Sequence, residues 1–146
     1  MNEAPRRVLY VDDDEGLRSL VRRALERRGY AVTLAASGEE GLAALQAGDC
    51  GVDLIALDHY MPGQGGFETL LQIRGLSDPP PIVYVTGSDE SQVAVSALKA
   101  GAADYVVKTV GDEFCDLLEN AFDQALAQVE LRRRHAKAEA DLVTIN

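Results

Sequence analysis

Cysteine is scarce in this sequence: Cys50 and Cys115 are the two that occur among its 146 residues. They form neither a CxxC pair nor a Cys/His pattern, so their spacing indicates no disulfide framework and no cysteine-based metal site. We expect both thiols to be reduced and at least partly buried, which indicates a reducing compartment. A chain of this length can bury a hydrophobic core without covalent staples.

Long apolar runs are absent as well. The N-terminal stretch MNEAPRRVLY lacks the apolar core of a secretory signal peptide. No segment approaches the ~20 consecutive apolar residues that a membrane-spanning helix needs. These absences predict a cytoplasmic domain that has no membrane partner.

Basic residues are the third deficit, because 14 Lys and Arg stand against 24 Asp and Glu and leave a net charge of −10. Nucleic-acid backbones select basic surfaces, so we expect no direct nucleic-acid binding by this domain. The acidic excess suits a protein that gathers carboxylates around a cation, although solubility alone would also account for it.

What the sequence does contain is a regular alternation of β-rich runs and helical patterns. The expected strands cover residues 7–11, 30–35, 52–58, 82–86 and 104–108. The expected helices run from about residue 17 to a stop at Gly29, from a capping box at Ser37 to about residue 47 with Gly48 behind it, over 67–74 and 90–100, and from 112 into the tail. This order predicts an α/β fold with a parallel sheet covered on both faces, either flavodoxin-like or Rossmann-like in strand order.

Polar residues stand at the carboxyl ends of four expected strands. Asp12 and Asp13 follow the first strand, Asp58 ends the third, Thr86 ends the fourth and Lys108 ends the fifth. Doubly wound folds bind ligands beyond the carboxyl ends of their strands, where the strand order reverses. In the flavodoxin-like order the first and third strands are neighbours, so these side chains would face one crevice.

Such a set of side chains suits phosphoryl chemistry with a divalent cation. Neighbouring carboxylates raise one another's pKa unless a cation neutralises them. Mg²⁺ or Mn²⁺ prefers oxygen ligands, and Mg²⁺ takes one or two carboxylates while it keeps several waters. Aspartate can attack phosphorus to form an acyl phosphate, and lysine supplies a compact charge for a phosphate oxygen. Asp14 and Glu15 have a plainer expected role, in the first turn of the following helix.

Four stretches carry a specific resemblance: VLYVDDDEGLR, DLIALDHYMPGQGGFE, PIVYVTG and GAADYVVK. In this order and spacing they resemble the CheY-like receiver domain of two-component response regulators. The resemblance implies a flavodoxin-like (βα)5 fold with a parallel sheet of order 2-1-3-4-5 and an extended C-terminal helix. It places the receiver domain at residues 6–125, followed at 126–146 by a helical extension or linker for which a coiled coil is one interpretation.

The same resemblance implies roles for the acids. Asp58 would be the phosphoacceptor and take its phosphoryl group from a histidine kinase or a phosphotransfer protein. Asp12, Asp13 and Asp58 would hold Mg²⁺ together with the main-chain carbonyl of Tyr60. The protein would be a phosphorylation-controlled switch and not an enzyme, apart from self-catalysed phosphotransfer and dephosphorylation.

Further positions of the family pattern imply how the switch works. Thr86 and Lys108 would bind the phosphoryl group, and Tyr105 would rotate inward behind Thr86. The face built from the fourth helix, the fifth strand and the fifth helix would then change and control an output partner or a fused domain. That face or the C-terminal helix would also support a homodimer.

Two positions bear on how fast the phosphoryl group is lost. Tyr60 and Ser88 stand where family members tune dephosphorylation, and neither supplies an acid or an amide that would orient water. We predict slow self-dephosphorylation, because a bulky Tyr60 would screen the phosphoryl group.

The chain also departs from the family at Thr109, where a proline usually follows the lysine. A cis peptide bond without proline costs about 2.5–4 kcal/mol, so the loop after Lys108 is expected to be trans with a shifted path, or strained.

Other functions fit parts of the pattern. An aspartyl-phosphate phosphatase would use the same acids, but it needs a cap domain and a second acid where Tyr60 stands. A degenerate receiver would serve as a dimerisation or docking module only. The loop MPGQGG lacks the GxxxxGK[ST] spacing of an ATPase and follows the wrong strand.

Two features leave simpler interpretations open. His59 has no metal-ligand spacing and is expected to be a loop side chain at the mouth of the site. In the last helix Leu118, Phe122, Ala125 and Val129 recur at alternating four- and three-residue steps. That seam fits a short coiled coil, and a solvated helical extension fits the charged tail equally well.

Overall fold

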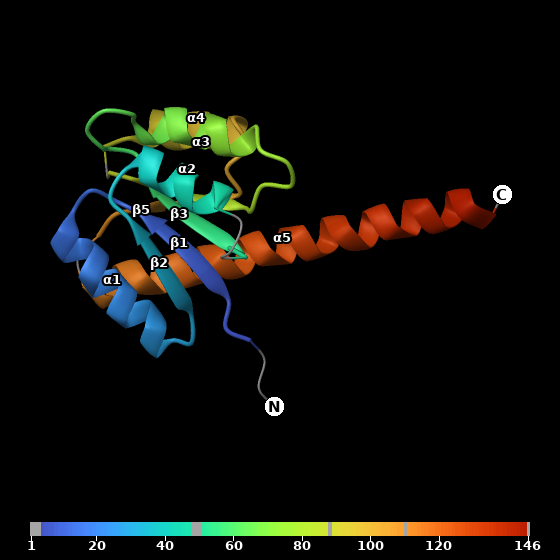
Figure 1. Ribbon diagram of the computed structural model, residues 1–146, viewed down its shortest axis with the longest axis horizontal. Coiled ribbons are helices and arrows are strands. Elements are labelled where there is room, and N and C mark those ends of the chain that lie inside the picture. The colour runs from blue at the N-terminus through green and yellow to red at the C-terminus, as the bar shows by residue number, and fades with distance from the viewer. Residues whose placement is uncertain (1–3, 48–50, 88, 110, 146) are drawn as a thin grey trace.

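The computed structural model describes residues 4–47, 51–87, 89–109 and 111–145, in which strands and helices alternate along the chain (Figure 1). The strands are β1 (Arg7–Val11), β2 (Ala31–Ala35), β3 (Leu54–Asp58), β4 (Ile82–Thr86) and β5 (Asp104–Val107). The helices are α1 (Glu15–Arg27), α2 (Gly38–Gln46), α3 (Gly66–Arg74), α4 (Ser91–Lys99) and α5 (Asp112–Ile145). The expected order of elements is confirmed, with bounds that differ by one or two residues.

The strands form one parallel sheet in the order β2-β1-β3-β4-β5. This order confirms the flavodoxin-like alternative, because the Rossmann-like order would place β1 beside β4. Val11 lies opposite Leu57, and Asp58 lies opposite Val85, so neighbouring strands end at the same level. We call this level, where β1, β3, β4 and β5 end, the carboxyl end of the sheet, and the level where they begin the amino end.

The sheet is covered on both faces, which explains its continuous apolar strands. Every residue of β3 and of β4 is buried. Helices α1 and α5 pack on one face through residues such as Leu25 and Phe122, and α2, α3 and α4 pack on the other through residues such as Ile73 and Ala97 (Figure 1). Full burial of one such large side chain contributes about 1.5–3 kcal/mol, so the two layers hold the strand ends in place.

Local signals in the sequence set the helix ends. The carboxylate of Asp14 accepts a hydrogen bond from the Leu17 amide at 3.0 Å, and the Ser37 hydroxyl accepts one from the Glu40 amide at 3.1 Å. Both caps satisfy amides that the first helical turn leaves unpaired. Gly29 has φ +95° and ends α1, as expected for a glycine after a helix. The expected stop at Gly48 lies outside the described residues.

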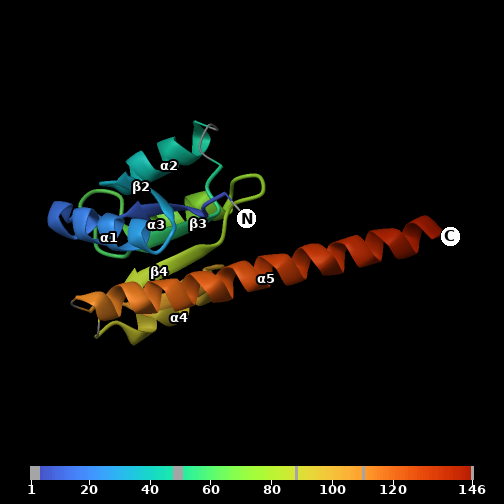
Figure 2. The same ribbon diagram turned by 90° about the horizontal axis from the view of Figure 1, so that it is seen from below.

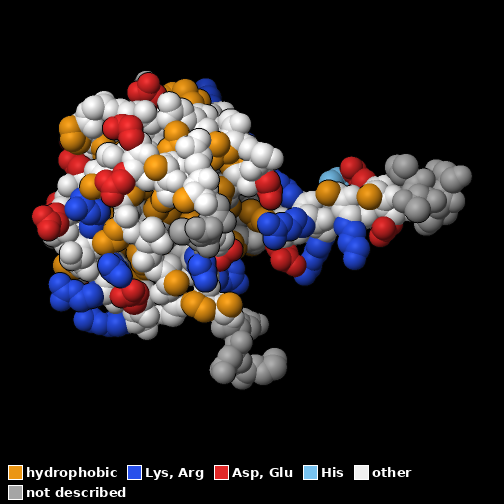
Figure 3. All heavy atoms as spheres, viewed as in Figure 1, with side chains coloured by type: hydrophobic (Ala, Val, Ile, Leu, Met, Phe, Trp, Pro, Cys, Tyr) orange, Lys and Arg blue, Asp and Glu red, His pale blue; other side chains and the backbone are white. Residues whose placement is uncertain are grey.

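Helix α5 has two unlike halves. Phe114, Leu118 and Phe122 in the first half are buried against the sheet, whereas every side chain from Glu130 to Leu142 is exposed. The second half leaves the rest of the molecule, and side chains of both charge signs follow its length (Figures 1, 2 and 3).

The proposed coiled-coil seam is therefore corrected in its first part. Leu118, Phe122 and Ala125 pack within the domain's own core, together with residues of the sheet and of α1, and so are not free to pair with the helix of a second chain. The same four- and three-residue spacing serves packing on a sheet and packing on a helix, so the sequence could not separate the two.

The cysteines and the apolarity of the helices were also the subject of predictions. Cys115 is a free, buried thiol, as predicted, and Cys50 lies outside the described residues. Among the helices of the described ranges, none combines the length and the apolarity that crossing a membrane requires.

Candidate functional site

The carboxyl end of the sheet brings three acids together. Asp12 directly follows β1, Asp58 is the last residue of β3, and their side chains are 0% and 5% exposed. One carboxylate oxygen from each of Asp12, Asp13 and Asp58 lies within 4.8 Å of the others. Asp13 is exposed, so the cluster opens toward solvent on one side. The predicted juxtaposition of these three residues is confirmed.

Lys108, which directly follows β5, completes the cluster. Its amine lies 2.9 Å from Oδ2 of Asp12 and 3.3 Å from Oδ2 of Asp58. The Lys108 amide donates to the carbonyl of Thr86 at 2.8 Å, which extends the β4–β5 pairing by one residue. No peptide bond in the described ranges is cis, so the loop entering Thr109 is trans and the lysine reaches the acids without a proline.

Asp12 is held by more groups than the sequence indicated. Its Oδ1 accepts from the Asp14 amide at 3.0 Å, and its Oδ2 accepts from the buried hydroxyl of Tyr10 at 3.0 Å. The Arg18 guanidinium donates to the main-chain carbonyl of Asp12 at 2.8 Å. Neither Tyr10 nor Arg18 was expected at the site from the sequence. For Tyr10 a signal existed, because residues two apart on a strand share one face.

A glycine lets the end of β3 approach α3. The Gly66 amide donates to the carbonyl of His59 at 3.0 Å. A Cβ at position 66 would overlap the carbonyl oxygen of Asp58 and lie 2.7 Å from Cα of His59. Only glycine fits this contact without moving the backbone that carries Asp58.

The charges of the cluster perturb one another. Burial and then the charge of Asp12 raise the pKa of Asp58 from 3.8 to about 7, although Lys108 acts in the opposite direction. Burial lowers the pKa of the Lys108 amine, but its bonds to Asp12 and Asp58 outweigh burial, and its pKa is raised overall. A divalent cation would stabilise the same carboxylates in their charged form. Additional positive charge at this site would thus stabilise the charged carboxylates.

A second polar cluster lies beside the acids. Nδ1 of His59 is 2.6 Å from the hydroxyl of Tyr84, and its Nε2 is 3.7 Å from Oε2 of Glu90. Oε1 of Glu90 accepts from the Gly87 amide at 2.7 Å. His59 follows β3 as a loop residue, as expected, but it is partly buried and bonded to β4. It therefore links the end of β3 to β4 and to the loop after Thr86.

Tyr60 lies over this second cluster. Its ring meets the His59 ring edge to face at 4.9 Å, and the residue is 68% exposed. A hydrogen bond from its hydroxyl to Glu90 raises the pKa of Tyr60. The side chain thus lies beside the end of β3, two residues after Asp58.

The remaining predicted residues occupy different environments. Thr86 is 2% exposed at the end of β4, and Tyr105 is 41% exposed on β5. Ser88 lies outside the described residues. Tyr105 and Thr86 lie on the neighbouring strands β5 and β4. In the register of these strands Tyr105 lies opposite Tyr84, two residues before Thr86.

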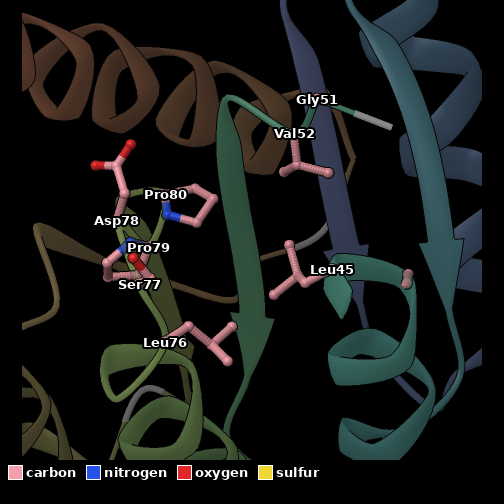
Figure 4. A pocket seen from close by; sticks show the side chains of 9 residues that line it. Leu45, Gly51, Val52, Leu76, Ser77, Asp78, Pro79 and Pro80 are labelled. Carbon is pink, nitrogen blue, oxygen red and sulfur yellow. The ribbon is translucent and has the colours of Figure 1, made fainter. Parts of the chain in front are cut away.

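The amino end of the sheet carries a hollow of a different kind. It measures about 240 Å³ and is lined by side chains such as Leu45, Val52, Leu76 and Pro80 (Figure 4). None of the four clustered charged residues lines it. The hollow therefore lies apart from the acid cluster.

Comparison with known proteins explains this geometry. The profile of the response regulator receiver domain matches residues 8–120. The chain belongs to this family. It is a receiver domain of a two-component response regulator, and receiver domains hold Mg²⁺ through a cluster of aspartates. The three oxygen donors from Asp12, Asp13 and Asp58 fit such an ion.

Relatives of this receiver domain are longer proteins. The chain is 39% identical over 109 residues to the transcriptional regulatory protein AfsQ1 of Streptomyces coelicolor, covering 75% of this chain and 47% of AfsQ1. It is 35% identical over 133 residues to the response regulator MprA of Mycobacterium tuberculosis, covering 91% of this chain and 53% of MprA. The chain thus spans about half the length of these curated relatives.

Solved structures agree with the fold. A receiver domain from Clostridium thermocellum superposes with a TM-score of 0.78 at 26% identity, covering 86% of this chain and 98% of that one. The chemotaxis protein CheY4 of Vibrio cholerae superposes with a TM-score of 0.69 at 30% identity, covering 88% and 98%.

Proposed function

We propose that Asp58 accepts a phosphoryl group from a phosphohistidine on a histidine kinase or a phosphotransfer protein. One observation carries the proposal: the Asp58 carboxylate lies 3.3 Å from the Lys108 amine and shares a 4.8 Å cluster with oxygens of Asp12 and Asp13. A nucleophilic carboxylate, a cation site and a phosphate-binding amine are the parts that phosphoryl transfer requires.

The cation site would be made of Asp12, Asp13, Asp58 and the main-chain carbonyl of Tyr60. Mg²⁺ or Mn²⁺ bound there would offset the negative charge of the phosphoryl oxygens. Asp58 needs this support, because its raised pKa of about 7 leaves part of the population protonated near neutral pH. Positive charge beside Asp58 favours the carboxylate form, which is the form that attacks phosphorus.

In the transfer step, a carboxylate oxygen of Asp58 forms a bond to phosphorus as the bond between phosphorus and the donor imidazole nitrogen breaks. The imidazole leaves with the bonding electron pair. Lys108 would bind a phosphoryl oxygen through its amine, which has three N–H donors and contacts two carboxylates. Attack of water on the acyl phosphate later regenerates Asp58 and releases inorganic phosphate.

The output would run through Thr86 and Tyr105. The Thr86 hydroxyl would donate a hydrogen bond to the phosphoryl group, and the exposed ring of Tyr105 would turn inward behind it. The face formed by α4, β5 and α5 would change and control an output partner or a fused domain, a two-state element biased by added charge. We assign residues 6–125 to this receiver and 126–146 to a helical extension or linker.

Rates and partners complete the proposal. Tyr60, anchored on His59 and Glu90, would limit access of water and slow dephosphorylation, and Ser88 occupies the second rate-tuning position. The chain would act in the cytoplasm as a switch without other enzymatic activity. A homodimer would form through the α4–β5–α5 face or the exposed half of α5, and no nucleic acid or membrane would bind this domain.

The test is the intact mass of the protein after incubation with acetyl phosphate and Mg²⁺. Wild type should gain one phosphoryl group and lose it on treatment with hydroxylamine, which cleaves acyl phosphates. Asp58→Ala should gain none. Asp53→Ala is the matched control, because Asp53 precedes the same strand at its other end, where its carboxylate accepts from the Arg7 amide at 2.9 Å. An unmodified, folded wild type would instead support a degenerate docking module.

A further inference from the structure

We propose that Tyr10 is a positioning residue for the cation site, and that its hydroxyl fixes the Asp12 carboxylate in the orientation that binds Mg²⁺. The proposal rests on the proposed function of the site. Its basis is a hydrogen bond of 3.0 Å from the Tyr10 hydroxyl to Oδ2 of Asp12, between residues that are 1% and 0% exposed. Tyr10 belongs to β1 and approaches the site from the core.

The hydrogen bonds of Asp12 determine its orientation. A carboxylate offers about four acceptor directions, two on each oxygen. Oδ2 accepts from Tyr10 at 3.0 Å and pairs with Lys108 at 2.9 Å, while Oδ1 accepts from the Asp14 amide at 3.0 Å. One direction on Oδ1 stays open in this set. Tyr10 and the Asp14 amide therefore hold the two oxygens of Asp12 from opposite ends of the carboxylate, which restricts its rotation.

Tyr10 and Lys108 differ in how firmly they hold Oδ2. The Lys108 amine sits on a flexible stem, is partly exposed, and also contacts Asp58. The ring of Tyr10 is 1% exposed and packs in the buried cluster that β1 forms with α1 and α5. When Lys108 turns to a phosphoryl oxygen, Tyr10 is the side chain that keeps Oδ2 bonded. A ligand held by such an outer group binds metal more tightly.

A buried tyrosine hydroxyl commonly finds some partner, so the bond alone would be compatible with ordinary core packing. Tyr84 provides the comparison within the same sheet. It is also fully buried on a neighbouring region of the sheet, but its hydroxyl pairs with His59, which is not an acid of the cluster. Tyr84→Phe loses a partly buried hydrogen bond and Tyr10→Phe a buried one, and of the two tyrosines only Tyr10 contacts a proposed cation ligand.

The experiment is a calorimetric titration of Mg²⁺ into wild type, Tyr10→Phe and Tyr84→Phe at fixed ionic strength, without a phosphoryl donor. We expect the Kd of Tyr10→Phe to rise about 10-fold and that of Tyr84→Phe to stay within about two-fold of wild type. Equal affinities for Tyr10→Phe and wild type would overturn the proposal. Urea unfolding of all three proteins shows that each is folded at the titration temperature.

A second readout separates positioning from a general structural defect. The rate of phosphorylation by acetyl phosphate should fall about 10-fold in Tyr10→Phe at subsaturating Mg²⁺ and return to within about two-fold of wild type at saturation. A rate that stays low at saturating Mg²⁺ would overturn the positioning role. Failure of wild type to bind Mg²⁺ would instead count against the proposed function, so the two failures are distinguishable.

Discussion

The two ends of the sheet differ in the environment of their acidic side chains. At the amino end, Asp53 is exposed and accepts from the Arg7 amide, so water solvates the carboxylate. At the carboxyl end, Asp12 and Asp58 are buried beside each other and depend on the Lys108 amine. One strand, β3, thus begins next to a solvated acid and ends in a buried one.

This difference shows that the fold does not require buried acids at its strand ends, whereas the site does. Burying like charges together is unfavourable, and the raised pKa of Asp58 is the direct expression of that cost. The amino end shows that the same sheet can end its strands without such an arrangement. Strongly perturbed carboxylates in a crevice are typical of functional sites, so the carboxyl end is where substitutions should alter chemistry more than stability.

The largest effect is expected for Lys108→Met. The amine of Lys108 is the positive charge that the protein itself places beside Asp58, and loss of one such prearranged group costs about 100-fold in rate. The initial rate of phosphorylation by acetyl phosphate at saturating Mg²⁺ measures it. Lys99→Met, in the last turn of α4, removes an equal charge and should leave the rate unchanged. Equal rates for the two variants would remove Lys108 from the mechanism.

The next largest effect is expected for Gly66→Ala, which adds a methyl group against the backbone of Asp58 and His59. Overpacking of this kind costs about 1–3 kcal/mol of unfolding free energy, measured by urea denaturation. Gly65→Ser is the control, since a Cβ at position 65 meets no atom within 4 Å and serine caps helices well. If both variants matched wild type in stability, the close approach of α3 to β3 would not constrain the site.

The third prediction sets Asp58→Asn against Asp53→Asn, the two ends of β3. The folded-state pKa of Asp58 lies above its unfolded value of 3.8, so its contribution to stability is present below about pH 4 and is lost as the pH rises through 7. In EDTA, Asp58→Asn should therefore be more stable than wild type at pH 8, and this gain should nearly vanish at pH 4. The urea midpoint at each pH gives the difference. A gain that did not vary with pH would contradict the buried-charge account, and Asp53→Asn should show no such gain.

Much of the fold and the meeting of the main residues could be predicted from the sequence. Parallel strands end at one level, so acids after β1 and β3 and a lysine after β5 had to converge once the strand order was known. The side-chain partners could not be predicted in this way. His59 bonds to Tyr84 from another strand, 25 residues away, and that contact depends on packing across the sheet.

The seam of α5 shows a second limit of the sequence. Leu118, Phe122 and Ala125 have the spacing of a coiled coil, yet they pack on their own sheet. Periodicity identifies the apolar face of a helix and says nothing about the surface that covers it. Tyr10 differs, because its spacing of two residues from Asp12 did indicate a shared face, and its hydroxyl reaches the Asp12 carboxylate.

The most direct test of the central claim is a titration of beryllofluoride, a mimic of the phosphoryl group, with and without Mg²⁺, followed by amide NMR. The account predicts saturable binding at a single site that requires Mg²⁺, with the largest shifts at Asp58, Thr86 and Lys108 and none in Asp58→Ala. If folded wild type in Mg²⁺ showed no change, or if Asp58→Ala changed to the same extent, the buried charges at the carboxyl end would not be a phosphoryl site.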